Sequence, residues 1–243
     1  MKKETHLWKS PHLNKEMTVN IYGHYGFAIM LFPSFTDKAN ECEENGMIEA
    51  IKPYLDKGKC RIFSLESVNC ESWLNDKISS EQKSNRHYEY NNFVTEEVVP
   101  FIFNSCGGPV PILTAGAKHG AFHAGNKYFR RPDLFYGVIA MSGTYNLQHY
   151  CGDYFDENCY FNSPVHYLPN LHDDYWLSFL KNKHHVHLLS GSGENENPSN
   201  TEHLGSVLSH KGIPHEVDIW DNQWGHDWNT WNKMLAHILE TRL

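Results

Sequence analysis

The chain has 243 residues, of which 21% are charged and 14% aromatic, and its formal net charge is −8. This length suits one α/β domain with a substantial core, so we expect residues 1–243 to form a single domain. The acidic balance, without a basic stripe, argues against nucleic acid as a partner. The apolar runs are too short to span a membrane, so a membrane partner is not expected either.

The N-terminal residues 1–6 contain no apolar core of a secretory signal. The six cysteines show no Cys-x-x-Cys spacing. Cysteines spread over a chain of this length are typical of free thiols in a reducing compartment. We therefore expect a cytoplasmic protein; nothing in the sequence indicates an oligomeric state.

Alternating apolar and polar residues, or short apolar runs, predict strands along most of the chain. In chain order the predicted strands are 17–22, Phe27–Phe32, Cys60–Leu65, 111–115, 136–141, 185–189 and 215–220. Apolar residues at helical spacing predict helices over 45–55, 87–103, 200–211 and 227–239, with a further helix after residue 118. Pro100 is expected to kink the second of these helices, 87–103.

This alternation of strands and helices predicts a mostly parallel sheet with helices on both faces. Only residues 23–26 separate the first two predicted strands, so we expect these two to form an antiparallel N-terminal hairpin at one edge. The less regular stretches 74–86 and 147–180 are expected to form loops over the carboxyl edge of the sheet, where such folds bind ligands.

Residues 111–124 have the sequence of a nucleophile elbow with an unexpected residue at its tip. An apolar strand runs into Gly116-Ala-Lys118-His-Gly120 and then into a helix of small residues. In an α/β-hydrolase the pattern Gly-x-Ser-x-Gly holds a serine above the sheet, and its outer glycines allow the tight turn. Lys118 stands at the serine position, so either this is a hydrolase scaffold whose chemistry is lost or changed, or the motif is a coincidence. The strands and helices of the rest of the chain favour an α/β-hydrolase fold with a variant catalytic triad.

The triad order of this fold is nucleophile, acid, histidine. His226 follows the last predicted strand and precedes the final helix, where Asp227 is a candidate N-cap. The acid should follow strand 185–189, where Glu194 and Glu196 compete. One of these two carboxylates would accept the hydrogen bond of the imidazole Nδ1–H.

An oxyanion hole needs two backbone N–H groups. One would come from His119, directly after Lys118, and the other from the loop after strand Phe27–Phe32, where Ser34 and Phe35 are candidates. Apolar walls are expected from Phe35 and Trp224. The run His184-His185-x-His187 contains metal-binding residue types, but neighbours in a strand face opposite sides. Neither a metal nor a cofactor is expected.

Motifs along nearly the whole chain carry a family resemblance, above all Gly120-Ala-Phe-His-Ala-Gly-Asn126 and Gly225-His-Asp-Trp228. The other matching segments are 31–34, 44–47, 71–73, 97–102, 131–135, 140–143, 162–164 and 211–214. The chain resembles an esterase family of α/β-hydrolases that is broadly related to feruloyl and S-formylglutathione esterases. The resemblance implies a small-molecule ester or acyl substrate, Glu196 as the acid, His226 as the base, and a serine where Lys118 stands.

Three interpretations of Lys118 fit this sequence. A desolvated, neutral amine could form a Schiff base with a carbonyl compound or act as a general base. An ion pair with Glu196 or Glu194 would leave a catalytically silent protein that binds a ligand or partner. A natural or engineered replacement of serine could simply have inactivated an esterase. We expect the ion-paired ammonium, because the predicted acid and base lie close enough to compensate its charge.

Overall fold

The computed structural model describes residues 1–183 and 185–243, and its centre is an eight-stranded sheet with the order β1-β2-β4-β3-β5-β6-β7-β8. Strands β1 and β2 and strands β2 and β4 pair antiparallel, and the remaining neighbours pair parallel. The strands are β1 Lys3–Ser10, β2 Lys15–Tyr22, β3 Phe27–Phe32, β4 Cys60–Leu65, β5 Ile112–Ala117, β6 Gly137–Met141, β7 His185–Ser190 and β8 Glu216–Ile219. The predicted, mostly parallel sheet is confirmed.

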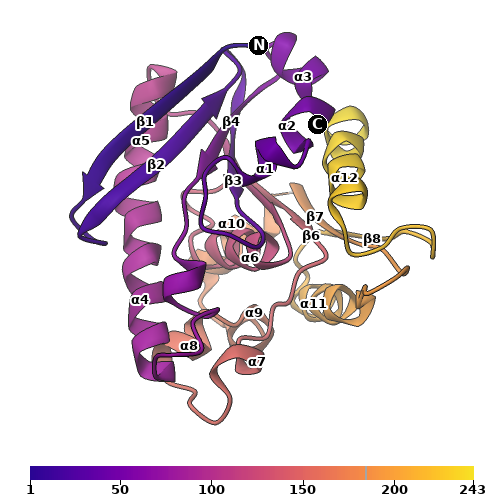
Figure 1. Cartoon of the computed structure of the whole chain (residues 1–243). Helices are drawn as coiled ribbons and strands as arrows, with labels where there is room; N and C mark the ends of the chain where they lie inside the picture. Colours follow the sequence, from indigo (N-terminus) through magenta and orange to yellow (C-terminus); the bar gives the residue numbers. More distant parts are fainter. Residues whose placement is uncertain (184) are drawn as a thin grey trace.

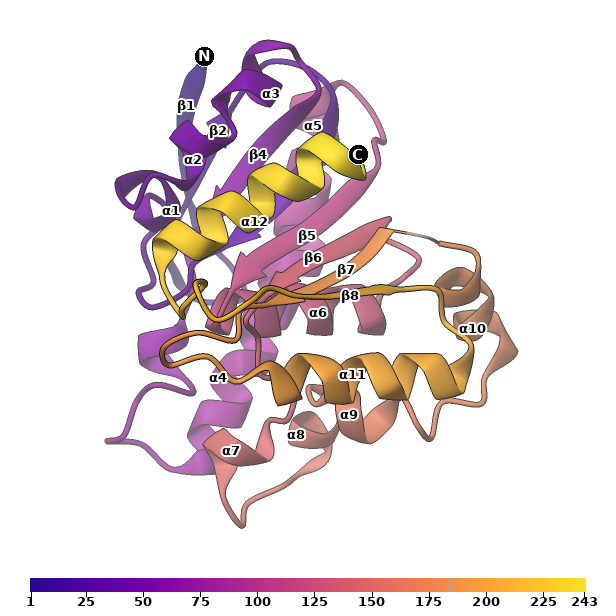
Figure 2. The ribbon, with the colours of Figure 1, turned by 90° about the vertical axis from the view of Figure 1, so that its right-hand side faces the viewer.

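Helices cover both faces of this sheet (Figures 1 and 2). The helix α12, drawn in yellow, packs with α1 to α3 over one face, and α4, α5, α6 and α11 lie over the other. The helices are α1 Glu41–Glu44, α2 Met47–Ala50, α3 Lys52–Asp56, η1 Asn69–Glu71, α4 Ser80–Asn92, η2 Phe93–Val98, α5 Val99–Cys106, α6 His119–Arg130, α7 Gln148–Cys151, α8 Glu157–Phe161, α9 Pro164–Tyr167, α10 Asp174–Lys181, α11 Pro198–Lys211 and α12 Trp228–Thr241.

The N-terminal edge hairpin exists, but its strands differ from the predicted pair. β2 pairs with β1, a strand that the sequence analysis missed, and on its other side with β4. β3 lies between β4 and β5 and is buried almost throughout. A strand whose two faces are both apolar gains most from a central position, so the short connection 23–26 does not make β2 and β3 neighbours.

Two predicted helices are interrupted by prolines. The predicted helix 45–55 divides at Ile51 into α2 and α3, because Pro53 has no N–H to donate and its ring fits only the first turn of a new helix. The predicted helix 87–103 begins earlier, at Ser80, behind a capping box formed by Ser79 and Gln82. It passes through the wider turns of η2 before Pro100 enters the first turn of α5.

The long irregular stretches also contain more helix than expected. α4 begins inside residues 74–86, and α7 to α10 occupy much of 147–180. All six cysteines are free thiols, as predicted. Among the described residues, no helix combines the length and the apolar character that a membrane crossing requires.

Candidate active site

The turn between β5 and α6 has the geometry of a nucleophile elbow. Lys118 has φ 53° and ψ −114°, a conformation that is uncommon for a residue with a side chain. A Cβ at Gly116 would lie 2.4 Å from the carbonyl carbon of Gly120, and a Cβ at Gly120 would lie 2.5 Å from the carbonyl oxygen of Phe32. Both positions therefore require glycine, and the turn presents the Lys118 side chain at the carboxyl end of the sheet.

The Lys118 ammonium rests on an aromatic ring. Its Nζ lies 3.9 Å from the centroid of the Phe35 ring, close enough for a cation–π interaction. Burial lowers the pKa of Lys118, while the charge of Glu41 acts in the opposite direction. In the part of the chain that the structure describes, no ion pair joins Lys118 to Glu196 or Glu194. The expected ion pair between the elbow lysine and the predicted acid is therefore wrong.

The predicted acid and base meet as expected. His226 Nδ1 lies 3.1 Å from Glu196 Oε2, and the Glu196 side chain is 1% exposed. Glu194 contacts His226 only through its backbone, because its carbonyl oxygen accepts from the His226 N–H. The carboxylate that orients the imidazole is thus the one at Glu196. Asp227 caps α12 by accepting from the Thr230 N–H, as predicted.

Polar groups at the ends of β6 and β7 hold the Glu196 carboxylate in place. The Ser142 hydroxyl donates to Oε1 at 2.5 Å, and the Ser190 hydroxyl and the Gly191 N–H also donate to the carboxylate. Burial on its own would raise the pKa of Glu196, but the hydrogen bonds with His226 and Ser142 outweigh it and lower the pKa. Glu196 is therefore fixed as an anion beside the imidazole.

An aromatic cluster connects the two halves of the site. The Phe35 ring contacts Trp228 and Trp231, and Trp231 lies edge-on to the His226 ring with 5.0 Å between centroids. The Trp231 Nε1–H donates to the Ser142 hydroxyl. Phe35, which Lys118 contacts, thus packs against Trp231, which His226 contacts. Phe35 was predicted from the sequence as a wall and Trp231 as part of a packing cluster, whereas no sequence signal pointed to Ser142.

Trp224, the other predicted wall, has different neighbours. Its ring contacts Trp220 at 5.0 Å between centroids, and Lys233 Nζ lies 4.5 Å from its ring centroid. His119, next to Lys118, is buried with its ring 5.2 Å from that of Tyr150. Burial and the nearby Lys118 charge lower the pKa of His119 to about 4, so this imidazole is neutral at physiological pH.

The loop that should supply the second oxyanion donor is occupied by a carboxylate. Glu41, on α1 and 4% exposed, accepts from the Ser34 N–H at 2.6 Å, the Phe35 N–H at 3.0 Å and the Thr36 N–H at 3.0 Å. Both predicted donor amides are therefore engaged in this structure. Glu41 is one of three acidic residues in α1, and nothing in its sequence position distinguished it from Glu43 and Glu44.

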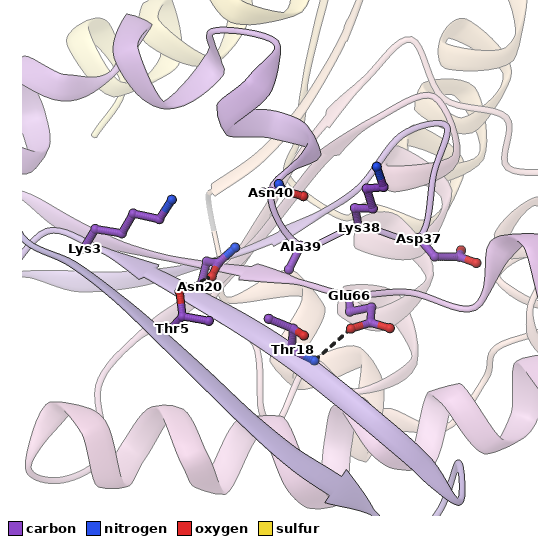
Figure 3. A pocket seen from close by; sticks show the side chains of 9 residues that line it. All are labelled: Lys3, Thr5, Thr18, Asn20, Asp37, Lys38, Ala39, Asn40 and Glu66. Carbon is purple, nitrogen blue, oxygen red and sulfur yellow. Dashed lines mark hydrogen bonds between the residues drawn. The ribbon is translucent and has the colours of Figure 1, made fainter.

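A polar cavity of about 460 Å³ lies beside the chain that connects this loop to α1. Figure 3 shows Lys3, Thr5 and Asn20 of the N-terminal hairpin on one side and residues 37–40 on the other. Thr18 and Glu66 complete the lining, and the Thr18 N–H donates a hydrogen bond to the Glu66 carboxylate. Lys118, His226 and Glu196 do not line this cavity.

Among the described residues, no group of three His, Cys, Asp or Glu is placed to hold a metal ion. His184 of the histidine run lies outside the described residues. His187 Nδ1 lies 3.2 Å from a carboxylate oxygen of Glu216.

The elbow, the His226–Glu196 pair and the sheet order together define an α/β-hydrolase fold. No protein-family model matches the sequence, and no curated protein matches it.

Solved structures of esterases match nearly the whole chain. A ferulic acid esterase has a TM-score of 0.74 and 18% identity, with 98% of this chain and 96% of that chain covered. The S-formylglutathione hydrolase of Agrobacterium tumefaciens has a TM-score of 0.76 and 12% identity, covering 98% and 93%. A ferulic acid esterase from Anaeromyces mucronatus, solved in complex with ferulic acid, has a TM-score of 0.70 and 11% identity, covering 99% and 90%.

Proposed function

We propose that this chain is an esterase-type hydrolase scaffold that binds a small carboxylic acid between Lys118 and His226 and does not turn over esters. The observation that carries the proposal is the replacement of the elbow nucleophile by a lysine beside an intact His226–Glu196 pair. The proposed binding residues are Lys118 and His226, with Glu196 holding the imidazole and Phe35 and Trp231 forming the apolar wall.

Ordinary serine-esterase turnover does not fit these residues. If the Lys118 amine attacked an ester carbonyl, the alcohol would leave with a proton and the acyl group would remain on Nζ as an amide. Amides hydrolyse far more slowly than esters, so the protein would stop after one event. The amides of Ser34 and Phe35 also donate to Glu41, so an oxyanion would have to displace that carboxylate.

A carboxylate matches the charge and shape of the proposed site. Lys118 has a cation–π contact but no ion pair among the described residues, so a carboxylate ligand would supply a negative charge in direct contact with the ammonium. Phe35 and Trp231 offer aromatic surface for an acyl group. A structural neighbour that binds ferulic acid makes an aromatic carboxylic acid a reasonable first probe.

Binding of ferulic acid and of methyl ferulate tests this proposal. We expect calorimetry to detect ferulate, and we expect Lys118→Met to weaken its binding by at least about tenfold, because a hydrogen bond to a charged group contributes about 1.5–3 kcal/mol. The neutral methyl ester shares the same skeleton and should not respond to Lys118→Met. Equal weakening of both ligands, or no binding of ferulate, would contradict a carboxylate site at Lys118.

A second candidate function is Schiff-base chemistry, which the lowered pKa of Lys118 supports. A lysine with a lowered pKa has a larger neutral, nucleophilic fraction at a given pH than an ordinary lysine. If this candidate holds, benzaldehyde with borohydride will label Lys118 at a lower pH than exposed lysines such as Lys57, and ferulate will protect it. Peptide mapping measures both effects. Labelling of Lys118 that only parallels Lys57 would exclude this chemistry.

A further inference from the structure

A second polar cavity lies at the opposite end of α6 from the elbow. It has a volume of about 170 Å³ and lies between the π-helical turns of η2 and the last turn of α6. Its lining residues are Asn91, Asn92, Thr95, Glu96, Lys127, Arg130 and Arg131. Lys127 is nine residues after Lys118, which along a helix corresponds to about 14 Å.

Among the described residues, two of its three cations donate hydrogen bonds only to side-chain amide oxygens, and Lys127 Nζ also lies 5.7 Å from the centroid of the Tyr90 ring. Lys127 is 3% exposed and its Nζ donates to the side-chain oxygen of Asn91. The Arg130 guanidinium donates to the side-chain oxygen of Asn162 at 3.1 Å. Within the described ranges, neither cation forms an ion pair with a carboxylate. Arg131 differs, because it forms two hydrogen bonds with Asp133.

The single carboxylate in the lining does not compensate these charges. Glu96 is 62% exposed and lies 3.1 Å from His12. Burial, together with the charge of Arg130, holds the pKa of Lys127 well below its usual range. Burial also lowers the pKa of His87 and His123, and the charge of Lys127 adds to both shifts. The interior beside α6 is therefore electropositive, and unpaired buried cations are costly.

We propose that this cavity binds a phosphate group through Lys127, Arg130 and Arg131. A tetrahedral dianion can accept hydrogen bonds from several directions at once, and guanidinium groups fit phosphate oxygens. The cavity is smaller than the roughly 300–1,000 Å³ of sites that enclose drug-sized ligands, so it suits a phosphate group and not a whole nucleotide. The source is either free phosphate or the head of a phosphomonoester.

Thermal unfolding in sulfate provides the first test, because sulfate is a tetrahedral dianion that does not titrate near neutral pH. At a concentration about 100-fold above its Kd, a site-bound anion should raise Tm by about 5–11 °C. Sulfate also stabilises proteins by exclusion from their surfaces, so the shift that remains in Lys127→Met defines that background. We expect Lys127→Met and Arg130→Gln to lose the site-specific shift, and Lys57→Met, at an exposed lysine outside both proposed sites, to keep it.

Calorimetry can measure proton uptake on binding, which would not depend on Lys127 if that lysine had only a structural role. An anion beside Lys127 raises the pKa of its amine, so sulfate binding should be accompanied by proton uptake over the pH range in which the unliganded amine titrates. The binding enthalpy will then depend on the ionisation enthalpy of the buffer. This dependence should disappear in Lys127→Met, which we expect to be at least as heat-stable as the parent chain in the absence of sulfate.

The proposal would be overturned if the sulfate shift were equal in the parent chain, Lys127→Met and Arg130→Gln. Loss of the shift in the control Lys57→Met would overturn it as well. Competition by inorganic phosphate and by glycerol 3-phosphate identifies the source of the ligand. Tighter binding of glycerol 3-phosphate assigns the cavity to a phosphomonoester, and tighter binding of inorganic phosphate assigns it to the free ion. Failure of both to compete with sulfate would contradict a phosphate site.

Discussion

Lys118→Ser is expected to hydrolyse short activated acyl esters that the parent chain does not hydrolyse. The substitution places a hydroxyl at the tip of the elbow, and the His226–Glu196 pair that would activate it is already in place. Loss of the nucleophile in a serine hydrolase costs about 10⁶-fold in kcat. A missing oxyanion donor costs about 10²–10³-fold, and Glu41 engages the Ser34 and Phe35 amides. We therefore expect a gain of about 10³-fold over the parent chain.

The measurement is the initial rate with a p-nitrophenyl ester, compared with two controls. Lys118→Ala removes the lysine without adding a hydroxyl, and Lys118→Ser combined with His226→Ala removes the proposed base. Both should stay at the rate of the parent chain. If Lys118→Ser folds like the parent chain and remains inactive, the His226–Glu196 pair does not activate a hydroxyl at the elbow. That result would contradict the proposal of an esterase-type scaffold.

Gly120→Ala is expected to be strongly destabilising, and Gly125→Ala in the same helix is not. A Cβ at Gly120 would lie 2.5 Å from the Phe32 carbonyl oxygen and 3.0 Å from that of Pro33, so two backbone segments would have to separate. A Cβ at Gly125 would lie 3.2 Å from the edge of the Tyr145 ring, which is a side chain. Overpacking of a well-filled interior costs about 1–3 kcal/mol or more, and the backbone clash places Gly120→Ala at about 3 kcal/mol.

At about 2–4 °C per kcal/mol for a chain of this size, Gly120→Ala should lower Tm by about 10 °C. Gly125→Ala should change the free energy of unfolding by less than about 1 kcal/mol, because the helix propensity of alanine offsets a small shift of Tyr145. Calorimetric melting of both variants measures the difference. Similar melting temperatures for the two would contradict the close packing of α6 against the end of β3.

Sequence patterns were sufficient for the elbow turn and for the contact between Glu196 and His226. The spacing of Gly116 and Gly120 after an apolar run predicted the tight turn at Lys118, and the structure has that turn. Glu196 and His226 each come after a strand of the parallel part of the sheet. Residues that follow parallel strands meet at the carboxyl edge of the sheet. These features depend on local turn chemistry and on strand order, and both can be inferred from the sequence.

Other features required contacts between residues far apart in the chain. β1 was missed, and the hairpin partner of β2 was wrong, because a short connection between β2 and β3 says nothing about which strand is buried on both faces. The predicted ion pair of Lys118 was wrong because Ser142, Ser190 and His226 already hold Glu196.

The sequence by itself therefore determined the parallel part of the sheet, the elbow, and the position of Glu196 and His226 at the carboxyl edge. Only the tertiary structure decided which partners the charged side chains have. Glu41 accepts from backbone amides of the loop after β3, and Lys127 is buried against Asn91. The physical reason is that apolar periodicity and glycine turns act over a few residues. The partner of a charged side chain depends instead on distances in space and on burial, which no local pattern encodes.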